Sequence, residues 1–281
     1  MMGAVKLASL FLAYGFIGYG GDYAVGLLAQ ERHASAHHVV VDVEQLVDVE
    51  VDVQHVAHVH MQHSGECEYE AERRVALDAS AAELLRLEAG SGALAVEGQA
   101  GLGQDQARGR ACAADAGYLD DLRLTLERVN DEIVLSAHYP DRSGRGNSYA
   151  RIDLVVEVPL NMAVDLDDSS GSMEVAGTGE LRIDASSGSI LVRGINGPVF
   201  IDDSSGEIEL SDVAGDVQID DGSGDIDVRD VQGSVYVRDG SGSMDIVEVD
   251  QSVIVEGDGS GSIEVRDVRG DFSVLSDGSG S

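Results

Sequence analysis

The sequence has no tryptophan, a single lysine (Lys6), three prolines and two cysteines, and aromatic residues make up only 4% of it. A nucleic-acid partner is excluded, because phosphate binding requires clustered Lys and Arg side chains. Binding to an anionic membrane surface is disfavoured for the same reason. The scarcity of aromatic side chains also argues against a sugar or base site that depends on ring stacking.

Acidic residues and glycine are abundant instead. Among 281 residues there are 52 acids against 18 bases, which gives a formal net charge of -34, and there are 35 glycines. Hydrophobic residues make up 43% of the chain, so it is not a disordered acidic tail. A chain of this length can bury a sizeable core in one large domain or two small ones.

The N-terminus is typical of an export signal. An apolar run (residues 7–17) follows Lys6 and is too short to span a bilayer. We therefore expect a signal peptide at residues 1–29, with cleavage after Ala29 or after Ala36. The alternative is an anchored or buried N-terminal helix. A signal peptide predicts an exported protein, located in the periplasm or at the cell surface.

Export bears on the two cysteines, Cys67 and Cys112. In an oxidising compartment, a lone pair of cysteines usually forms a disulfide. The alternative is two unrelated buried thiols.

Residues 30–65 form a histidine-rich leader or linker. Seven of the eight histidines lie between His33 and His63, and valine alternates with acids over residues 47–53. Such alternation predicts a strand wherever the segment is ordered. Closely spaced imidazoles can bind zinc, copper or nickel, but a solvated linker accounts for the same composition.

The strongest signal is an internal repeat over residues 165–281. Small residues ending in Ser-Gly recur every 17 to 19 positions, and each glycine is followed by apolar residues at +2 and +4. A second apolar pair completes each unit. The repeated segments are Asp168–Gly171, Ala185–Gly188, Asp203–Gly206, Asp221–Gly224, Asp239–Gly242, Asp258–Gly261 and Asp277–Gly280.

This repeat predicts a parallel β-solenoid with coils of about 18 residues. Apolar residues two apart indicate strands with one inward face, and two such strands bury a core only when coils stack. An antiparallel sandwich is the alternative, but its turns would recur every 8–12 residues. Residues 85–96 show the same pattern of strand, corner and strand. We interpret residues 66–164 as irregular first coils with an insert.

The segments Val158–Leu160, Asp168–Val175 and Gly109–Ala113 resemble those of the bacterial "putative adhesin" domain-of-unknown-function family 4097. The resemblance covers roughly residues 66–281. It implies an exported β-solenoid and supplies no catalytic residues. The long leader at residues 30–65 departs from the family pattern.

Parallel β-helices include polysaccharide lyases and hydrolases, so an enzyme is the alternative function. No Gly-x-Ser-x-Gly elbow, P-loop or His-Glu-x-x-His is present. We predict no catalytic residue and no enzyme, but an envelope or cell-surface interaction protein that binds an unidentified protein or glycan.

The repeat also stacks carboxylates into a column, and neighbours about 4.8 Å apart repel one another. A cation with oxygen ligands, such as Ca²⁺, would relieve this repulsion, and no other cofactor is expected. Alternatively, the side chains splay into water and salt screens them. The residues are Asp203, Asp221, Asp239, Asp258 and Asp277.

The last complete strand pattern, residues 272–274, is followed only by another corner. A final coil without a cap exposes backbone groups and apolar side chains. We therefore expect end-to-end self-association through this coil.

Overall fold

A computed structural model describes residues 67–78, 82–102, 104–140 and 149–280. The predicted signal peptide (residues 1–29) and the histidine-rich leader (residues 30–65) lie outside these residues. Within the described residues, no helix is long and apolar enough to cross a membrane.

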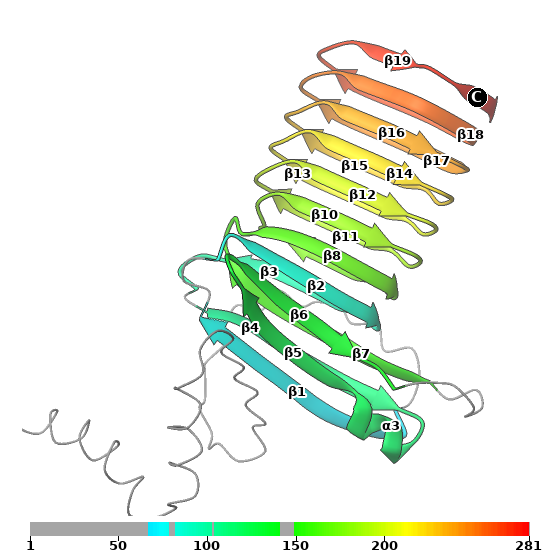
Figure 1. Cartoon of the computed structure of the whole chain (residues 1–281). Coiled ribbons are helices and arrows are strands. Elements are labelled where there is room, and N and C mark those ends of the chain that lie inside the picture. Colours follow the sequence, from blue (N-terminus) through cyan, green and yellow to red (C-terminus); the bar gives the residue numbers. More distant parts are fainter. Residues whose placement is uncertain (1–66, 79–81, 103, 141–148, 281) are drawn as a thin grey trace, which may run out of the picture. The chain divides into compact units, whose positions relative to one another are not determined.

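The regular part of the chain is a parallel β-solenoid, as the repeat predicts. Each coil contributes one strand to each of two facing sheets, and successive coils stack in register (Figure 1). Val217, for example, lies opposite Val199 of the coil before and Val235 of the coil after. We call the two sheets sheet 1 and sheet 2.

Sheet 1 faces the viewer in Figure 1. Its parallel strands are β6 (Glu132–His138), β2 (Leu84–Ser91), β8 (Ala163–Ser170), β10 (Leu181–Ala185), β12 (Val199–Asp203), β14 (Val217–Asp221), β16 (Val235–Asp239), the first part of β18 (Val253–Val268), and then β19 (Phe272–Val274) with β20 (Asp277–Gly280).

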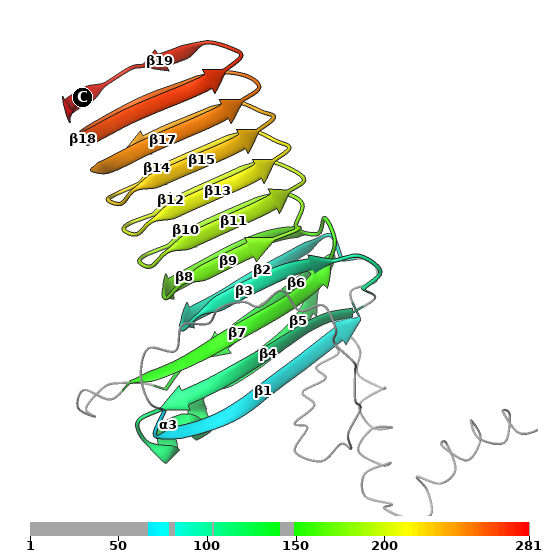
Figure 2. The same ribbon diagram turned by 180° about the vertical axis from the view of Figure 1, so that it is seen from behind.

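Sheet 2 faces the viewer in Figure 2. Its parallel strands are β7 (Ala150–Pro159), β3 (Leu94–Gln99), β9 (Met173–Ala176), β11 (Ile190–Ile195), β13 (Ile208–Val213), β15 (Ile226–Val231), β17 (Gly242–Val249) and the second part of β18.

The core lies between the two sheets and is one side chain deep from each. In β14, Val217 and Ile219 point inward and are buried, while Gln218 points outward and is exposed. Val228 of β15 packs into the same core from sheet 2. Burying each such side chain contributes roughly 1.5–3 kcal/mol, so every coil adds its own share to stability.

Glycine is required at the corner that leads from sheet 1 to sheet 2. Gly188 has a φ of +123°, a backbone conformation that residues with a side chain rarely adopt. A Cβ atom there would collide with the carbonyl oxygen of Gly171 in the coil before. The repeated Ser-Gly therefore marks where two stacked backbones touch.

The N-terminal part differs from the predicted run of irregular coils, because several of its strands are antiparallel. β1 (Tyr69–Asp78) pairs with β4 (Gln104–Ala113), and β4 pairs with β7 at the edge of sheet 2. β5 (Arg123–Val129) pairs antiparallel with β6 at the edge of sheet 1. The reason is local: only Asn130 and Asp131 join β5 to β6, and Asn130 has a φ of +59°. A two-residue turn of this kind forces an antiparallel hairpin.

One coil is stacked out of chain order. β2 and β3 lie between the coil formed by β6 and β7 and the coil formed by β8 and β9. This coil therefore comes first in the sequence, and later segments of the chain lie on both sides of it. Residues 85–96 thus belong to the solenoid, as their pattern indicated.

At the other end of the described chain, β19 leaves apolar side chains in contact with water. Phe272 and Val274 are exposed, and Leu275 is 69% exposed. The end-to-end association expected from this coil stays a prediction.

Candidate functional site

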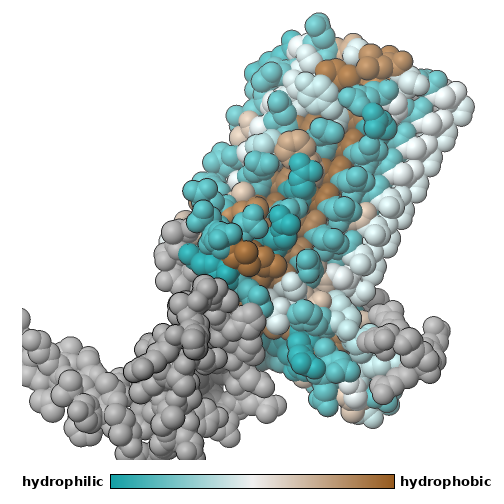
Figure 3. All heavy atoms as spheres, in the orientation of Figure 1, coloured by the Kyte–Doolittle hydropathy of each residue, from teal (hydrophilic) through white to brown (hydrophobic). Residues whose placement is uncertain are grey.

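The outer face of sheet 1 carries a groove with a volume of about 340 Å³. Because the strands are in register, outward side chains at equivalent positions form rows that run across the coils. Figure 3 looks onto this face, where rows of hydrophilic residues run across the coils and hydrophobic residues show between them. One row consists of Arg86, Asp165, Arg182, Phe200, Gln218 and Tyr236, and the other of Glu88, Asp167, Asp184, Asp202, Asp220 and Arg238.

The basic side chains of this face are already engaged. The Arg182 guanidinium lies over the Phe200 ring, 4.9 Å from its centroid, in a cation–π contact. Arg86 lies 3.5 Å from Asp165. Arg238 donates to Asp220 at 3.0 Å and to Glu256 of β18 at 2.9 Å.

The second row is left with a run of unopposed negative charge. Asp167, Asp184 and Asp202 are exposed and adjacent in register. Among the described residues, none of the three forms an ion pair, because the nearby arginines pair elsewhere. The face therefore offers a row that contains Phe200 and Tyr236 beside a row with three stacked, unpaired carboxylates. The site was not predicted from the sequence. The residues that could have indicated it are those between the two members of each second apolar pair, because they point outward.

The predicted aspartate column is real, but most of it lies inside the solenoid. Asp203, Asp221, Asp239 and Asp258 are 2–4% exposed and stack in register. Asp277 continues the register but is exposed. The inward orientation follows from the strand alternation, because Val217, Ile219 and Asp221 share one face of β14. This inward position differs from the two expectations drawn from the sequence, in which the carboxylates bind a cation or splay into water.

Two of the buried carboxylates, Asp221 and Asp239, each cap a backbone N–H that points into the corner. The Gly222 N–H donates to the Asp203 carbonyl of one neighbouring coil, and the Gly224 N–H donates to the Ser241 carbonyl of the other. The Ser223 N–H between them donates to Asp221 Oδ1 at 3.3 Å. Ser241 and Asp239 repeat the arrangement at 3.0 Å. One function of the carboxylate is thus to satisfy an N–H that no coil can reach.

All four carboxylates have at least one oxygen without a protein partner. Asp221 Oδ2, Asp239 Oδ2 and both oxygens of Asp203 and Asp258 are buried and accept no hydrogen bond from a protein group. Burial raises the pKa of Asp221 to about 6, and the carboxylates of Asp203 and Asp239 add to the effect. Burial likewise raises the pKa values of Asp203 and Asp239.

Asp168 of β8 occupies the same position but stands apart from the other four. It is buried, and burial raises its pKa to about 6. Ala185 lies opposite both Asp168 and Asp203 and interrupts the column. The Ala185 coil still forms the corner, since the Gly188 N–H bonds to the Ser205 carbonyl like its counterparts. A carboxylate is therefore not required for the corner to fold.

The column does not gather its carboxylates around one point. In the described ranges, no group of three or more His, Cys, Asp or Glu side chains is arranged to hold a metal ion. Each interval of the column has two carboxylates, one from each neighbouring coil. A cation site at this column stays a prediction.

A second acidic column follows the ends of the sheet 2 strands. It consists of Asp212, Asp230, Glu248 and Asp267, which all have φ between +53° and +60°. They are exposed, and a hydrogen bond shared with Asp230 raises the pKa of Glu248. These side chains face water, where salt screens their repulsion.

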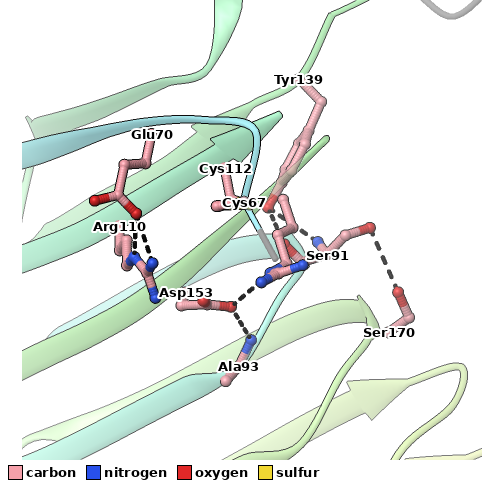
Figure 4. Close-up of polar contacts among 10 residues, drawn as sticks. Cys67, Glu70, Ser91, Ala93, Arg110, Cys112, Tyr139, Asp153 and Ser170 are labelled. Atoms are coloured by element: carbon pink, nitrogen blue, oxygen red, sulfur yellow. Dashed lines mark hydrogen bonds and ion pairs between the residues drawn. A yellow bond between two sulfur atoms is a disulfide. The ribbon is translucent and has the colours of Figure 1, made fainter. Parts of the chain in front are cut away.

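Cys67 and Cys112 are joined by a disulfide, with a Cα–Cα distance of 5.6 Å. Figure 4 shows the surroundings of this bond. Cys112 is buried in β4, and the bond ties the chain just before β1 to its partner strand. Glu70 and Arg110 form an ion pair across the same two strands.

Tyr139 fixes the first corner of the solenoid in the same region (Figure 4). Its hydroxyl lies 2.6 Å from the Ala89 carbonyl, and it accepts from the Ser91 N–H at 2.9 Å. Burial raises the pKa of Tyr139 to about 12, so the hydroxyl keeps its proton and stays a donor. These contacts are structural and offer no reactive group.

Comparisons with known proteins bear on the fold. No family model matches the chain, and no curated protein matches it. A solved structure of a "putative adhesin" from Bacteroides fragilis aligns with a TM-score of 0.51 and 11% identity. The alignment covers 76% of this chain and 98% of that one. At this identity the likeness shows a shared fold.

Two further solved structures are similar at a lower level. A "putative cell adhesion protein" from Clostridium sporogenes has a TM-score of 0.31 and 14% identity, and the alignment covers 76% of this chain and 100% of that one. A "putative lipid binding protein" from Parabacteroides distasonis has a TM-score of 0.43 and 14% identity, with 76% and 97% covered. Membership of family 4097 stays a prediction.

Proposed function

We propose that the chain is an exported, non-enzymatic interaction protein of the cell envelope or surface, which binds a protein or glycan partner across the outer face of sheet 1. The observation that supports this is the groove, in which Phe200 lies beside the unopposed carboxylates of Asp167, Asp184 and Asp202, while Tyr236 continues the row of Phe200 beyond Gln218. The name of the Bacteroides fragilis neighbour is in keeping with an adhesive role.

A solenoid suits this role because it holds a long row of side chains rigidly. Every outward residue of sheet 1 is fixed by parallel pairing with the coil on either side. Little conformational entropy is then lost when a partner docks. Aromatic side chains with a polar surround are also the usual anchors of interfaces.

A β-helix enzyme that acts on polysaccharide is the competing function, since the groove does place Arg86 and Arg182 beside carboxylates of adjacent strands. A lyase needs a group that accepts a proton. Arg86 is paired with Asp165, and Arg182 covers Phe200. A guanidinium also stays protonated at all ordinary pH values. The groove is therefore better suited to holding a ligand than to abstracting a proton.

The proposal can be tested by measuring how labelled full-length protein binds to envelope fragments of the producing bacterium. The double variant Phe200→Ala/Tyr236→Ala should lower affinity by about tenfold or more, because two aromatic anchors are lost. Leu191→Ala is the matched control, as Leu191 is a half-buried outward residue on the opposite sheet. An equal loss in both variants, or in neither, would count against the proposal.

A further inference from the structure

The aspartates inside the solenoid carry negative charge that no described side chain neutralises. Four in-register carboxylates are more than nine-tenths buried, and each has at least one oxygen without a protein partner. Parallel strands lie about 4.8 Å apart, so successive carboxylates are near neighbours. Buried like charges at this spacing cannot all be ionised. A proton or a cation must therefore neutralise part of this charge in the corner.

In the described part of the chain, no basic group is among the charges that act most strongly on the column. The charges that act most strongly on the column are other carboxylates: Asp202 on Asp203, Asp258 and Asp225 on Asp239, and the column's own members on Asp221. Around Asp168 they are Asp167 and the Tyr139 hydroxyl. The apolar core of both sheets adjoins the corner. Neither strand neighbours nor opposing strands therefore contribute a compensating charge.

We propose that the column formed by Asp203, Asp221, Asp239 and Asp258 is an internal proton-binding site, in which protonated carboxyl groups donate to the free carboxylate oxygens of neighbouring coils. A protonated carboxyl has one donor and retains acceptors, so a stack can alternate donation and capping. This gives partners to oxygens that otherwise have none. The pKa of Asp221, raised to about 6, agrees with proton uptake in a weakly acidic medium, and burial also raises the pKa values of Asp203 and Asp239.

The coil at Ala185 indicates that the column is not a by-product of the corner. That coil makes the same corner without a carboxylate. Four consecutive buried aspartates therefore add a property that the fold itself does not require. The property is stability that increases as the medium becomes acidic.

The direction follows from the pKa shift. A carboxyl whose pKa is higher in the folded chain than in the unfolded chain favours folding while it is protonated. The stabilisation is complete below the unfolded value of 3.8 and is lost as pH rises through about 6. Most acidic proteins with paired carboxylates show the opposite trend.

The test is thermal unfolding of the full chain at pH 5 and pH 8, at a salt concentration that screens exposed carboxylates. The unfolding temperature should be higher at pH 5. Asp221→Asn mimics the protonated carboxyl, so it should raise the unfolding temperature at pH 8 and reduce the difference between the two pH values by about half. The infrared band of protonated carboxyls at pH 6 should weaken in the same variant.

Glu209→Gln is the matched control, because Glu209 is exposed on the outer face of sheet 2 and should leave the pH difference unchanged. Asp221→Ala copies Ala185 and provides a second variant if the amide disturbs the corner. An unfolding temperature that is equal or higher at pH 8, or a pH difference that survives in both Asp221 variants, would overturn the proposal. A rise at pH 8 with calcium, absent with matched sodium and lost in Asp221→Asn, would show that the column holds cations instead.

Discussion

The N-terminal part (residues 67–159) and the regular array (residues 163–280) bury similar apolar side chains but are held together differently. In the N-terminal part, residues far apart in the chain are tied by antiparallel pairing, a disulfide and the Tyr139 contacts. In the array, each coil pairs only with its two neighbours. A change in the array therefore acts on adjacent coils, whereas a change in the N-terminal part acts across a long stretch of sequence.

The two parts also treat the ends of the sheets differently. β4 and β5 pair antiparallel with the edge strands of the two sheets at the N-terminal end, and β1 pairs with β4. Such a cap protects the backbone groups of the first parallel strands. The array then needs no tertiary tie of its own beyond stacking, corner glycines and capped N–H groups.

The disulfide gives the largest expected difference between the two parts. Replacing both Cys67 and Cys112 by serine should cost about 4 kcal/mol in the chain-entropy model, given their separation of 45 residues. Hydrogen exchange should accelerate in β1 and β4 and change little in β13 to β17. Equal acceleration of hydrogen exchange in β1, β4 and β13 to β17 would contradict the claim that the two parts are held together independently. Two free thiols in exported wild-type protein would show that the bond does not form in the cell.

Replacing a glycine should instead destabilise the regular array more than the N-terminal part. Gly188→Ala should destabilise by about 2–4 kcal/mol, because the added Cβ combines a positive φ with a collision against Gly171. Gly101→Ala in the N-terminal part is the control. Gly101 also has a positive φ, but a Cβ there meets nothing within 4 Å, so the cost should be about 1 kcal/mol. Chemical denaturation measures both, and equal costs would refute the close-stacking argument.

Surface ion pairs on the array should have the smallest effect. Arg238→Ala removes contacts to Asp220 and Glu256, but the side chains are about half exposed, so the cost should stay below about 1 kcal/mol. Chemical denaturation at low and high salt checks this. A loss of several kcal/mol would mean that charge pairing, rather than the Val and Ile core, holds the coils together.

The same two parts differ in what sequence could predict. The array follows from a period of 17 to 19 residues, in which most coils repeat the spacing of Val217, Ile219 and Gly224. The inward position of Asp221 could have been read from the same alternation. The hairpin turn at Asn130 and Asp131 was also visible, because two alternating apolar segments flank it.

Other features had no local signal. The pairing of β1 with β4, and the position of β2 and β3 between later coils, depend on contacts between distant segments. The groove residues Arg182, Phe200 and Gln218 point outward, where the repeat leaves residue type free. Their grouping becomes visible only when the register is known.

The central claim is that sheet 1, and not sheet 2, is the binding face. A photo-crosslinking amino acid in place of Gln218 would lie exposed in the groove, and one in place of Glu209 would lie exposed on the outer face of β13. Illumination of intact cells should yield a defined crosslinked product from position 218 and none from position 209. The same product from both positions, or a product from position 209 alone, would contradict the account.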